Sequence, residues 1–198
     1  MKKTIKIIIV VGILLSLLSC ATQKSIVNGV YTNLEEALKN PMEVTHLKLI
    51  RKKYKKFPVE IFKLKNLEIL DLSKNKIDSI PPGISELKQL EELYMKSNRM
   101  EKFPKSICSL VHLKIVSFFD NQISDIPDEI KGLPNLEKLD LYRNSIEEIS
   151  SEIGTLKKLK RLDLRMIEIS DEEQERIKSL VPNARVLLTE SCNCSTYY

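Results

Sequence analysis

The chain has 198 residues, 42% of them hydrophobic and 30% charged, with a formal net charge of +5 at pH 7. Lys2, Lys3 and Lys6 belong to a leader that the sequence predicts to be removed, which lowers the net charge to +2. A protein this close to neutrality has no general electrostatic attraction for nucleic acid, so nucleic acid is excluded as a partner.

Residues 1–19 form a predicted signal peptide. A basic start, residues 1–6, is followed by an almost unbroken apolar run over residues 7–18. This run is shorter than the ~20 residues that span a bilayer, and it is typical of a secretory leader.

The leader ends in Leu17-Leu-Ser-Cys20, which resembles the lipobox of bacterial lipoproteins. The resemblance implies that Cys20 carries lipid and holds the protein in the bacterial cell envelope, on the extracytoplasmic side of a membrane. Ala21 after it resembles lipoproteins passed on to the outer membrane, where one exists. Ordinary cleavage and a retained anchor stay open as alternatives. Residues 20–30 are small and polar, and we expect a lipidated tether there.

Residues 31–43 are predicted to form an N-terminal cap helix. Thr32 lies three residues before Glu35, the spacing of a capping box. Leu34, Ala37 and Leu38 then give a short apolar stripe before Asn40-Pro41. Such a helix would close the open end of a repeat array.

Six copies of one 23-residue pattern follow over residues 44–169. The pattern has apolar residues at positions 1, 4, 6, 11, 14, 18 and 21, and the first five copies fill all seven. The copies start at Val44, Leu67, Leu90, Leu113, Leu136 and Leu159. A fixed period of this length indicates a solenoid, in which stacked neighbours build a core that no single copy could form. The sequence predicts one elongated domain.

The segments Leu67-Glu-Ile-Leu-Asp-Leu-Ser-Lys-Asn75 and Leu136-Glu-Lys-Leu-Asp-Leu-Tyr-Arg-Asn144 resemble the leucine-rich repeat. The resemblance implies an α/β solenoid with a curved parallel sheet on the concave face and short helices or turns on the convex face. The polar residue at position 9 is expected to satisfy buried backbone groups, as a structural ladder. Its members are Asn75, Asn98, Asn121 and Asn144.

Residues 170–189 are predicted to form a C-terminal cap helix and an edge strand. Ser170 and Glu173 repeat the capping box, and residues 186–188 are apolar. Residues 190–198 are expected to be a flexible tail, and its Cys192 and Cys194 lack the further ligands that a metal site requires. Cys108 is expected to be a small, mostly buried side chain.

The sequence predicts no enzyme, no cofactor and no metal site. It contains no Gly-rich phosphate loop and no catalytic motif, and its five glycines lie far apart. Asp140 and Asp163 fall in neighbouring copies, where two carboxylates could act as acid and base. The basic residues around them favour exposed ion pairs instead.

Positions 3, 5, 7 and 8 of each copy are expected to point out of the concave sheet, because side chains alternate across a strand. Aromatic residues gather there in copies 3 to 5, beside basic ones, as in interaction hot spots. The alternative is that they are ordinary surface aromatics without a partner. The candidate partner-binding residues are Tyr94, Lys96, Ile115, Phe119, Tyr142, Arg143 and Arg165.

These features predict a membrane-anchored, monomeric binding module that grips a protein or peptide with its concave face. The alternative is a structural or glycan-binding lipoprotein of the cell envelope, in which the same aromatics stack on sugars.

Overall fold

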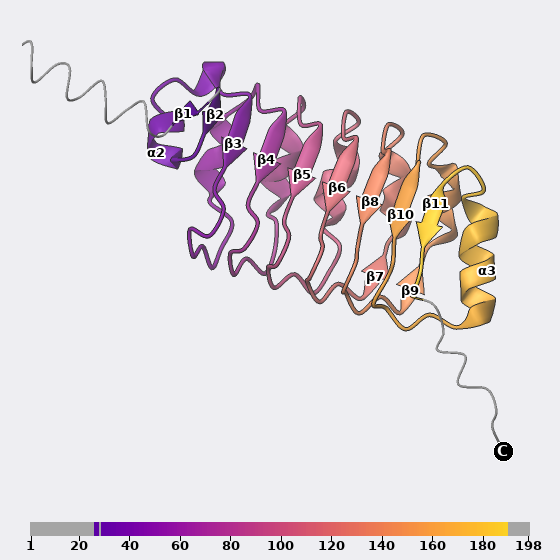
Figure 1. Cartoon of the computed structure of the whole chain (residues 1–198). Helices are drawn as coiled ribbons and strands as arrows, with labels where there is room; N and C mark the ends of the chain where they lie inside the picture. The colour runs from indigo at the N-terminus through magenta and orange to yellow at the C-terminus, as the bar shows by residue number, and fades with distance from the viewer. Residues whose placement is uncertain (1–25, 28, 190–198) are drawn as a thin grey trace, which may run out of the picture.

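The computed structural model describes residues 26–27 and 29–189, and within them the repeats stack into one solenoid (Figure 1). Its main sheet has the order β1-β2-β3-β4-β5-β6-β8-β10-β11, and every neighbouring pair is parallel except β1 and β2. The predicted leucine-rich repeat fold is confirmed. The strands are β1 Ile26–Val27, β2 Val30–Tyr31, β3 His46–Lys48, β4 Ile69–Asp71, β5 Glu92–Tyr94, β6 Ile115–Ser117, β8 Lys138–Asp140, β10 Arg161–Asp163 and β11 Arg185–Leu187.

The strands of the main sheet pair in a register that follows the 23-residue period. Position 3 of one copy pairs with position 3 of the next, as Glu92 with Ile115 and Ile115 with Lys138. The middle residue of each strand points into the core and its two neighbours point outward, because side chains alternate along a strand. These middle residues are all fully buried: Leu47, Leu70, Leu93, Val116, Leu139 and Leu162.

Short 3-10 helices form the opposite side of the solenoid. Pro58, Pro81, Pro104 and Pro127 stand at their N-caps, where a missing N–H costs nothing and the fixed φ starts the turn. Each helix buries the isoleucine of position 18 against the core. They are η2 Val59–Lys63, η3 Pro82–Glu86, η4 Lys105–Ser109, η5 Asp128–Gly132 and η6 Ser151–Thr155. Between sheet and helices, β7 (Asp125–Ile126) pairs with β9 (Glu148–Ile149) in a separate parallel ladder.

The turn that leaves each main strand has a left-handed residue at position 8. Its φ lies between 52° and 58° in all six copies, although none of the six is a glycine: Arg51, Lys74, Ser97, Asp120, Arg143 and Met166. Position 8 is therefore the first left-handed residue of the turn. The expectation that its side chain points out of the concave sheet stays a prediction.

The N-terminal end departs from the predicted cap in two ways. The helix α2 is a single turn, Leu34–Ala37, and its N-cap is Asn33 rather than Thr32. The Asn33 side chain accepts hydrogen bonds from the N–H groups of Glu35 and Glu36, so a stronger capping residue takes the role predicted for Thr32. A 3-10 turn, η1, follows over Pro41–Glu43.

Part of the predicted tether is folded. β1 and β2 form an antiparallel hairpin around Gly29, whose φ of 76° suits glycine, and Tyr31 is buried in the core. The prediction of a tether over 20–30 is therefore wrong from residue 26 onward, because β1 and β2 are the first two strands of the main sheet. The predicted signal peptide and Cys20 lie outside the described residues.

At the other end, α3 (Asp171–Leu180) packs beside β11 (Figure 1). Ser170 is its N-cap and accepts from the N–H of Glu173 at 3.3 Å, whereas the Glu173 carboxylate pairs with Arg176. Cys192, Cys194 and the predicted flexible tail lie outside the described residues. Among the helices that the structure describes, none has the length and apolarity needed to cross a membrane.

Candidate binding face

The concave face consists of positions 3, 5 and 7 of each copy. Because the strands pair in register, equivalent side chains line up across the sheet, one copy beside the next. The predicted site residues come from β5 and β6 and from the turns that follow β5, β6, β8 and β10.

A stack of three side chains occupies position 7 of copies 4 to 6. The rings of Phe119 and Tyr142 are stacked, with centroids 5.1 Å apart and planes 12° apart. The guanidinium carbon of Arg165 lies 5.1 Å from the centroid of Tyr142. Adjacent strands are separated by about 4.8 Å, which is close to the spacing of stacked rings, so register alone brings these groups together.

Tyr94, Lys96 and Ile115 lie in a second group beside the stack. They line an open depression of about 240 Å³, and Lys96 Nζ lies 5.1 Å from the centroid of the Tyr94 ring. The Tyr94 hydroxyl donates to Glu92 at 2.7 Å; burial and this hydrogen bond raise the pKa of Tyr94 above its usual range. The remaining lining residues are Ser117, Lys138, Leu139, Asp140 and Arg161.

Arg143 does not join either group. It has the left-handed backbone of position 8, and its Nε lies 3.4 Å from a carboxylate oxygen of Asp120 in the preceding turn. Arg143 therefore lies in the turn after β8, and its part in a binding face stays a prediction. The other six predicted residues lie in the stack and the depression.

The aspartates of position 5 have a role that the sequence analysis missed. Asp71, Asp140 and Asp163 each accept a hydrogen bond from the backbone N–H two residues later, at 2.9, 3.2 and 3.4 Å. This contact fixes the residue of position 7, and so the start of the turn. The recurrence of Asp two residues before the outward-facing position 7 was the available signal.

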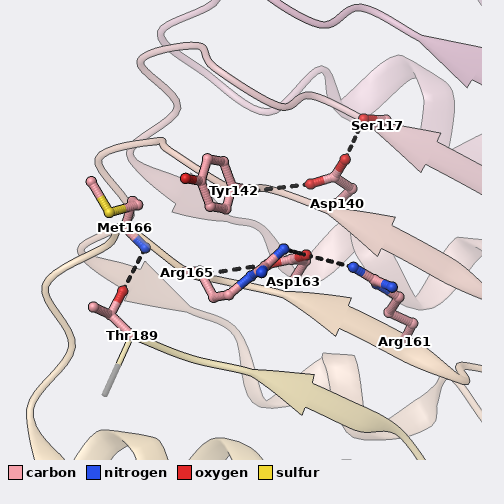
Figure 2. Close-up of polar contacts among 8 residues, drawn as sticks. All are labelled: Ser117, Asp140, Tyr142, Arg161, Asp163, Arg165, Met166 and Thr189. Carbon is pink, nitrogen blue, oxygen red and sulfur yellow. Dashed lines mark hydrogen bonds and ion pairs between the residues drawn. The ribbon is translucent and has the colours of Figure 1, made fainter. Parts of the chain in front are cut away.

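Asp163 also pairs with two arginines, as Figure 2 shows. Arg161 and Arg165 donate to its carboxylate at 2.9 and 2.7 Å. Burial alone would raise the pKa of Asp163, but the hydrogen bonds from Arg165 and Arg161 outweigh it, and the pKa is lowered. The predicted ion pair exists here, although its carboxylate is buried rather than exposed.

Asp140 differs from that prediction. Its carboxylate accepts from the Ser117 hydroxyl at 2.7 Å and from the Tyr142 N–H, and it forms no ion pair with a described residue (Figure 2). Ser117 lies on the neighbouring strand, at the pairing position of Asp140. Because strand pairing places the Ser117 hydroxyl next to Asp140, the carboxylate binds this hydroxyl rather than a basic side chain.

The asparagine ladder connects successive copies. Asn98 accepts from the N–H of Ile77 at 3.0 Å and donates to the carbonyls of Leu72 and Met95. Asn75, Asn121 and Asn144 make the equivalent bonds in their copies. Each side chain thus binds backbone groups on both sides of a boundary between copies.

Cys108 is buried, and burial raises the pKa of its thiol to about 12, which makes it unreactive near neutral pH. Within residues 26–27 and 29–189, no group of three or more His, Cys, Asp or Glu side chains could hold a metal ion. The chemistry available on the concave face is therefore aromatic stacking, hydrogen bonding and charge pairing.

The repeat region matches known family models. A leucine rich repeat model matches residues 43–100, and a model of two leucine rich repeats matches residues 111–151. Proteins of this family are generally non-catalytic binding scaffolds. A comparison with curated proteins finds no match.

Several solved structures are similar to this chain. A leucine-rich repeat protein of Leptospira interrogans is 31% identical with a TM-score of 0.67, over 79% of this chain and 40% of that one. The ectodomain of the Arabidopsis thaliana receptor kinase GASSHO1/SCHENGEN3, in complex with Casparian strip integrity factor 2, is 27% identical with a TM-score of 0.57, over 74% and 18%. An internalin of Listeria monocytogenes is 22% identical with a TM-score of 0.62, over 81% and 52%.

The chain spans about 40% of the Leptospira protein and about half of the internalin. The repeat positions, their register and the matched family models all lead to one assignment. The chain is a leucine-rich repeat protein, similar in structure to those of Leptospira and Listeria.

Proposed function

We propose that the protein binds a protein or peptide partner through its concave face while a lipid on Cys20 anchors it to a membrane of the cell envelope, on the extracytoplasmic side. The observation that carries the binding proposal is the stack of Phe119, Tyr142 and Arg165 beside the depression lined by Tyr94, Lys96 and Ile115. Large, rigid rings next to arginine are the groups that dominate binding energy in protein interfaces.

The shape of the face supports a partner with an extended segment. Its open depression adjoins the aromatic row and receives side chains from four consecutive copies. The similar plant ectodomain was solved in complex with Casparian strip integrity factor 2. A leucine-rich repeat scaffold can therefore bind such a factor. A peptide lying across several strands would contact both the stack and the depression.

The test is crosslinking in the native envelope, followed by recovery of the protein and its bound partner. We expect the wild type to retain a partner that the Phe119→Ala, Tyr142→Ala double variant loses by about tenfold or more, because two interface aromatics are removed. A matched control is Val59→Ala with Val111→Ala, since both valines are exposed and lie outside the concave face, within or after 3-10 helices. Recovery of the same proteins with all three would reject the concave site.

The same aromatics would suit a structural or glycan-binding lipoprotein. Retention of the purified protein by isolated cell wall, lost in the aromatic double variant and kept in the valine control, would replace the proposed protein partner with a glycan. Tyr142 lies between Phe119 and Arg165, so the outer face of Phe119 is the ring face that remains for either ligand.

The anchor has its own test. Cells fed a labelled fatty acid should label the wild-type protein, and Cys20→Ser should abolish that label. A label that persists in Cys20→Ser would remove the anchor from the proposal and leave the concave site untouched.

A further inference from the structure

The turns after the main strands lie side by side along one edge of the solenoid, the lower edge of the view in Figure 1. Backbone hydrogen bonds fix each turn to the next, from Arg51 N–H to the Ser73 carbonyl and from Lys74 N–H to the Lys96 carbonyl. Positions 8 to 13 of the six copies therefore lie along one edge, where their exposed side chains share one surface.

The charge of this edge reverses halfway along the array. In copies 1 to 3, residues 51–56, 74–79 and 97–102 contain nine basic and two acidic side chains, a net charge of +7. In copies 4 to 6, residues 120–125, 143–148 and 166–171 contain one basic and six acidic side chains, a net charge of −5. We name these the basic edge and the acidic edge.

The cations of the basic edge are available to a partner. All nine are exposed, and only Lys56 is paired with a described residue, with Asp78 at 2.6 Å. By contrast, many other lysines of the array pair with a glutamate of a neighbouring copy, as Lys65 with Glu86 and Lys114 with Glu91. The nine cations are Arg51, Lys52, Lys53, Lys55, Lys56, Lys74, Lys76, Arg99 and Lys102.

We propose that the basic edge docks on the anionic phospholipid headgroups of the membrane that holds the protein. Copies 1 to 3 then lie against the bilayer, while the acidic edge is repelled from it. The surface is distinct from the concave face, so lipid contact leaves the proposed partner site open.

Chain position favours a lipid surface as the occupant. The first strand of the parallel array, β2, begins ten residues after Cys20, and it pairs with β3 of copy 1. Ten residues span at most about 35 Å, so a lipid on Cys20 would keep the first copies close to the headgroups. This step rests on the proposed anchor. Clusters of unpaired lysine and arginine are attracted to the negative surface of an anionic leaflet.

The test uses the full chain with Cys20→Ser, so that binding does not depend on attached lipid. Sedimentation compares vesicles of phosphatidylcholine alone with vesicles of equal parts phosphatidylcholine and phosphatidylglycerol. The basic-edge variant carries Lys52→Gln, Lys55→Gln and Lys76→Gln. The matched control carries Lys63→Gln, Lys88→Gln and Lys157→Gln, three exposed lysines within or just after 3-10 helices. The leader is the same in every variant.

We expect the unsubstituted chain to prefer phosphatidylglycerol vesicles, the basic-edge variant to lose about tenfold or more of that preference, and the control to keep it. Raising the salt from about 0.05 to about 0.5 M should suppress the preference, because screening shortens the reach of surface charges. Equal losses in the two triple variants, or no preference in the unsubstituted chain, would overturn the proposal.

A second copy is the competing occupant, since the basic edge of one molecule could face the acidic edge of another. Light scattering that shows a dimer, dissolved by the three basic-edge substitutions, with unchanged vesicle binding, would replace the lipid proposal. Neither readout uses the lipid on Cys20 or the concave aromatics. Failure of those proposals is therefore distinguishable from failure of this one.

Discussion

Asn75, Asn98, Asn121 and Asn144 show how one polar side chain holds an apolar lattice together. Each is nearly buried, yet its amide is fully used by backbone groups of two copies. Without these bonds, N–H and carbonyl groups would be buried unpaired, at a cost of about 1 to 3 kcal/mol each. Position 9 is therefore a structural position, because its side chain binds the backbone of the turns and not a ligand.

Replacing Asn121 with alanine should destabilise the protein by about 2 kcal/mol, because the N–H of Met100 loses its side-chain partner. The carbonyls of Met95 and Phe118 each lose one of two hydrogen bonds and keep the bond from Asn98 or Asn144. Urea unfolding measures this free energy. Lys52→Ala is the matched control, since Lys52 occupies the same position in copy 1 but is exposed, and it should change stability by less than about 0.5 kcal/mol. Similar losses in both variants would contradict the role of the ladder.

Because of Asp163, the free energy of unfolding should depend on pH in the acidic range. Its pKa is lowered in the folded protein, so its contribution is present above the unfolded pKa of about 3.9 and is lost as the pH falls through the lower folded value. Asp163→Asn should therefore cost about 2 kcal/mol at pH 7, and the difference from wild type should shrink below about pH 4. Thermal unfolding over a pH series measures it; a difference independent of pH would show that Asp163 acts only through packing.

At the scale of elements, the sequence predicted the strands and turns well because their apolar positions repeat six times. It could not give the left-handed residue of position 8, since Arg51, Lys74 and Asp120 carry no glycine-like signal and adopt φ above 50° only because the stacked turn requires it. The hairpin β1–β2 was also missed, because two-residue strands show no periodicity. At the site, spacing alone brought Phe119 and Tyr142 together, whereas the contact between Arg143 and Asp120 depended on that turn.

The 3-10 helices pack tightly enough to require glycine at one point. A Cβ on Gly132, at the end of η5, would overlap the carbonyl oxygen of Cys108 in η4. Gly132→Ala should therefore destabilise the protein by about 2 kcal/mol, since a backbone atom has to move. The control is Gly154→Ala in η6, whose Cβ would lie 3.1 Å from the nearest backbone oxygen, that of Leu180.

Chemical unfolding of the two glycine variants compares these packing sites directly. Because the neighbour of Gly154 needs to shift by only a few tenths of an ångström, its loss should be the smaller of the two. A larger loss in Gly154→Ala than in Gly132→Ala would show that η4 and η5 can separate without cost.

At the scale of the whole molecule, the array is one-dimensional, since each strand pairs only with those of adjacent copies. The effect of a destabilising substitution should therefore reach the adjacent copies and decrease with distance along the solenoid. The charge reversal between the basic and acidic edges is likewise a property of the assembled array, because no single copy displays it.

A substitution that leaves a cavity near one end of the array should destabilise that end first. Leu162 in β10 is fully buried, and Leu162→Ala should cost about 2 to 5 kcal/mol. Hydrogen exchange should then accelerate in β8, β10 and β11 while β3 and β4 stay protected. Leu70→Ala in β4 is the mirror control and should reverse this pattern. Uniform acceleration in both variants would show that the array unfolds as a single unit.

The asparagine ladder has a consequence for how such a chain can change in length. Each asparagine accepts from a backbone N–H of the copy before it in the same geometry, so the unit that the scaffold can gain or lose is the whole 23-residue module. A single inserted residue inside a strand would turn its core side chains toward solvent, whereas an added module would extend the binding face by one row. Evolution can thus enlarge the binding face one 23-residue module at a time while the packing of the core stays the same.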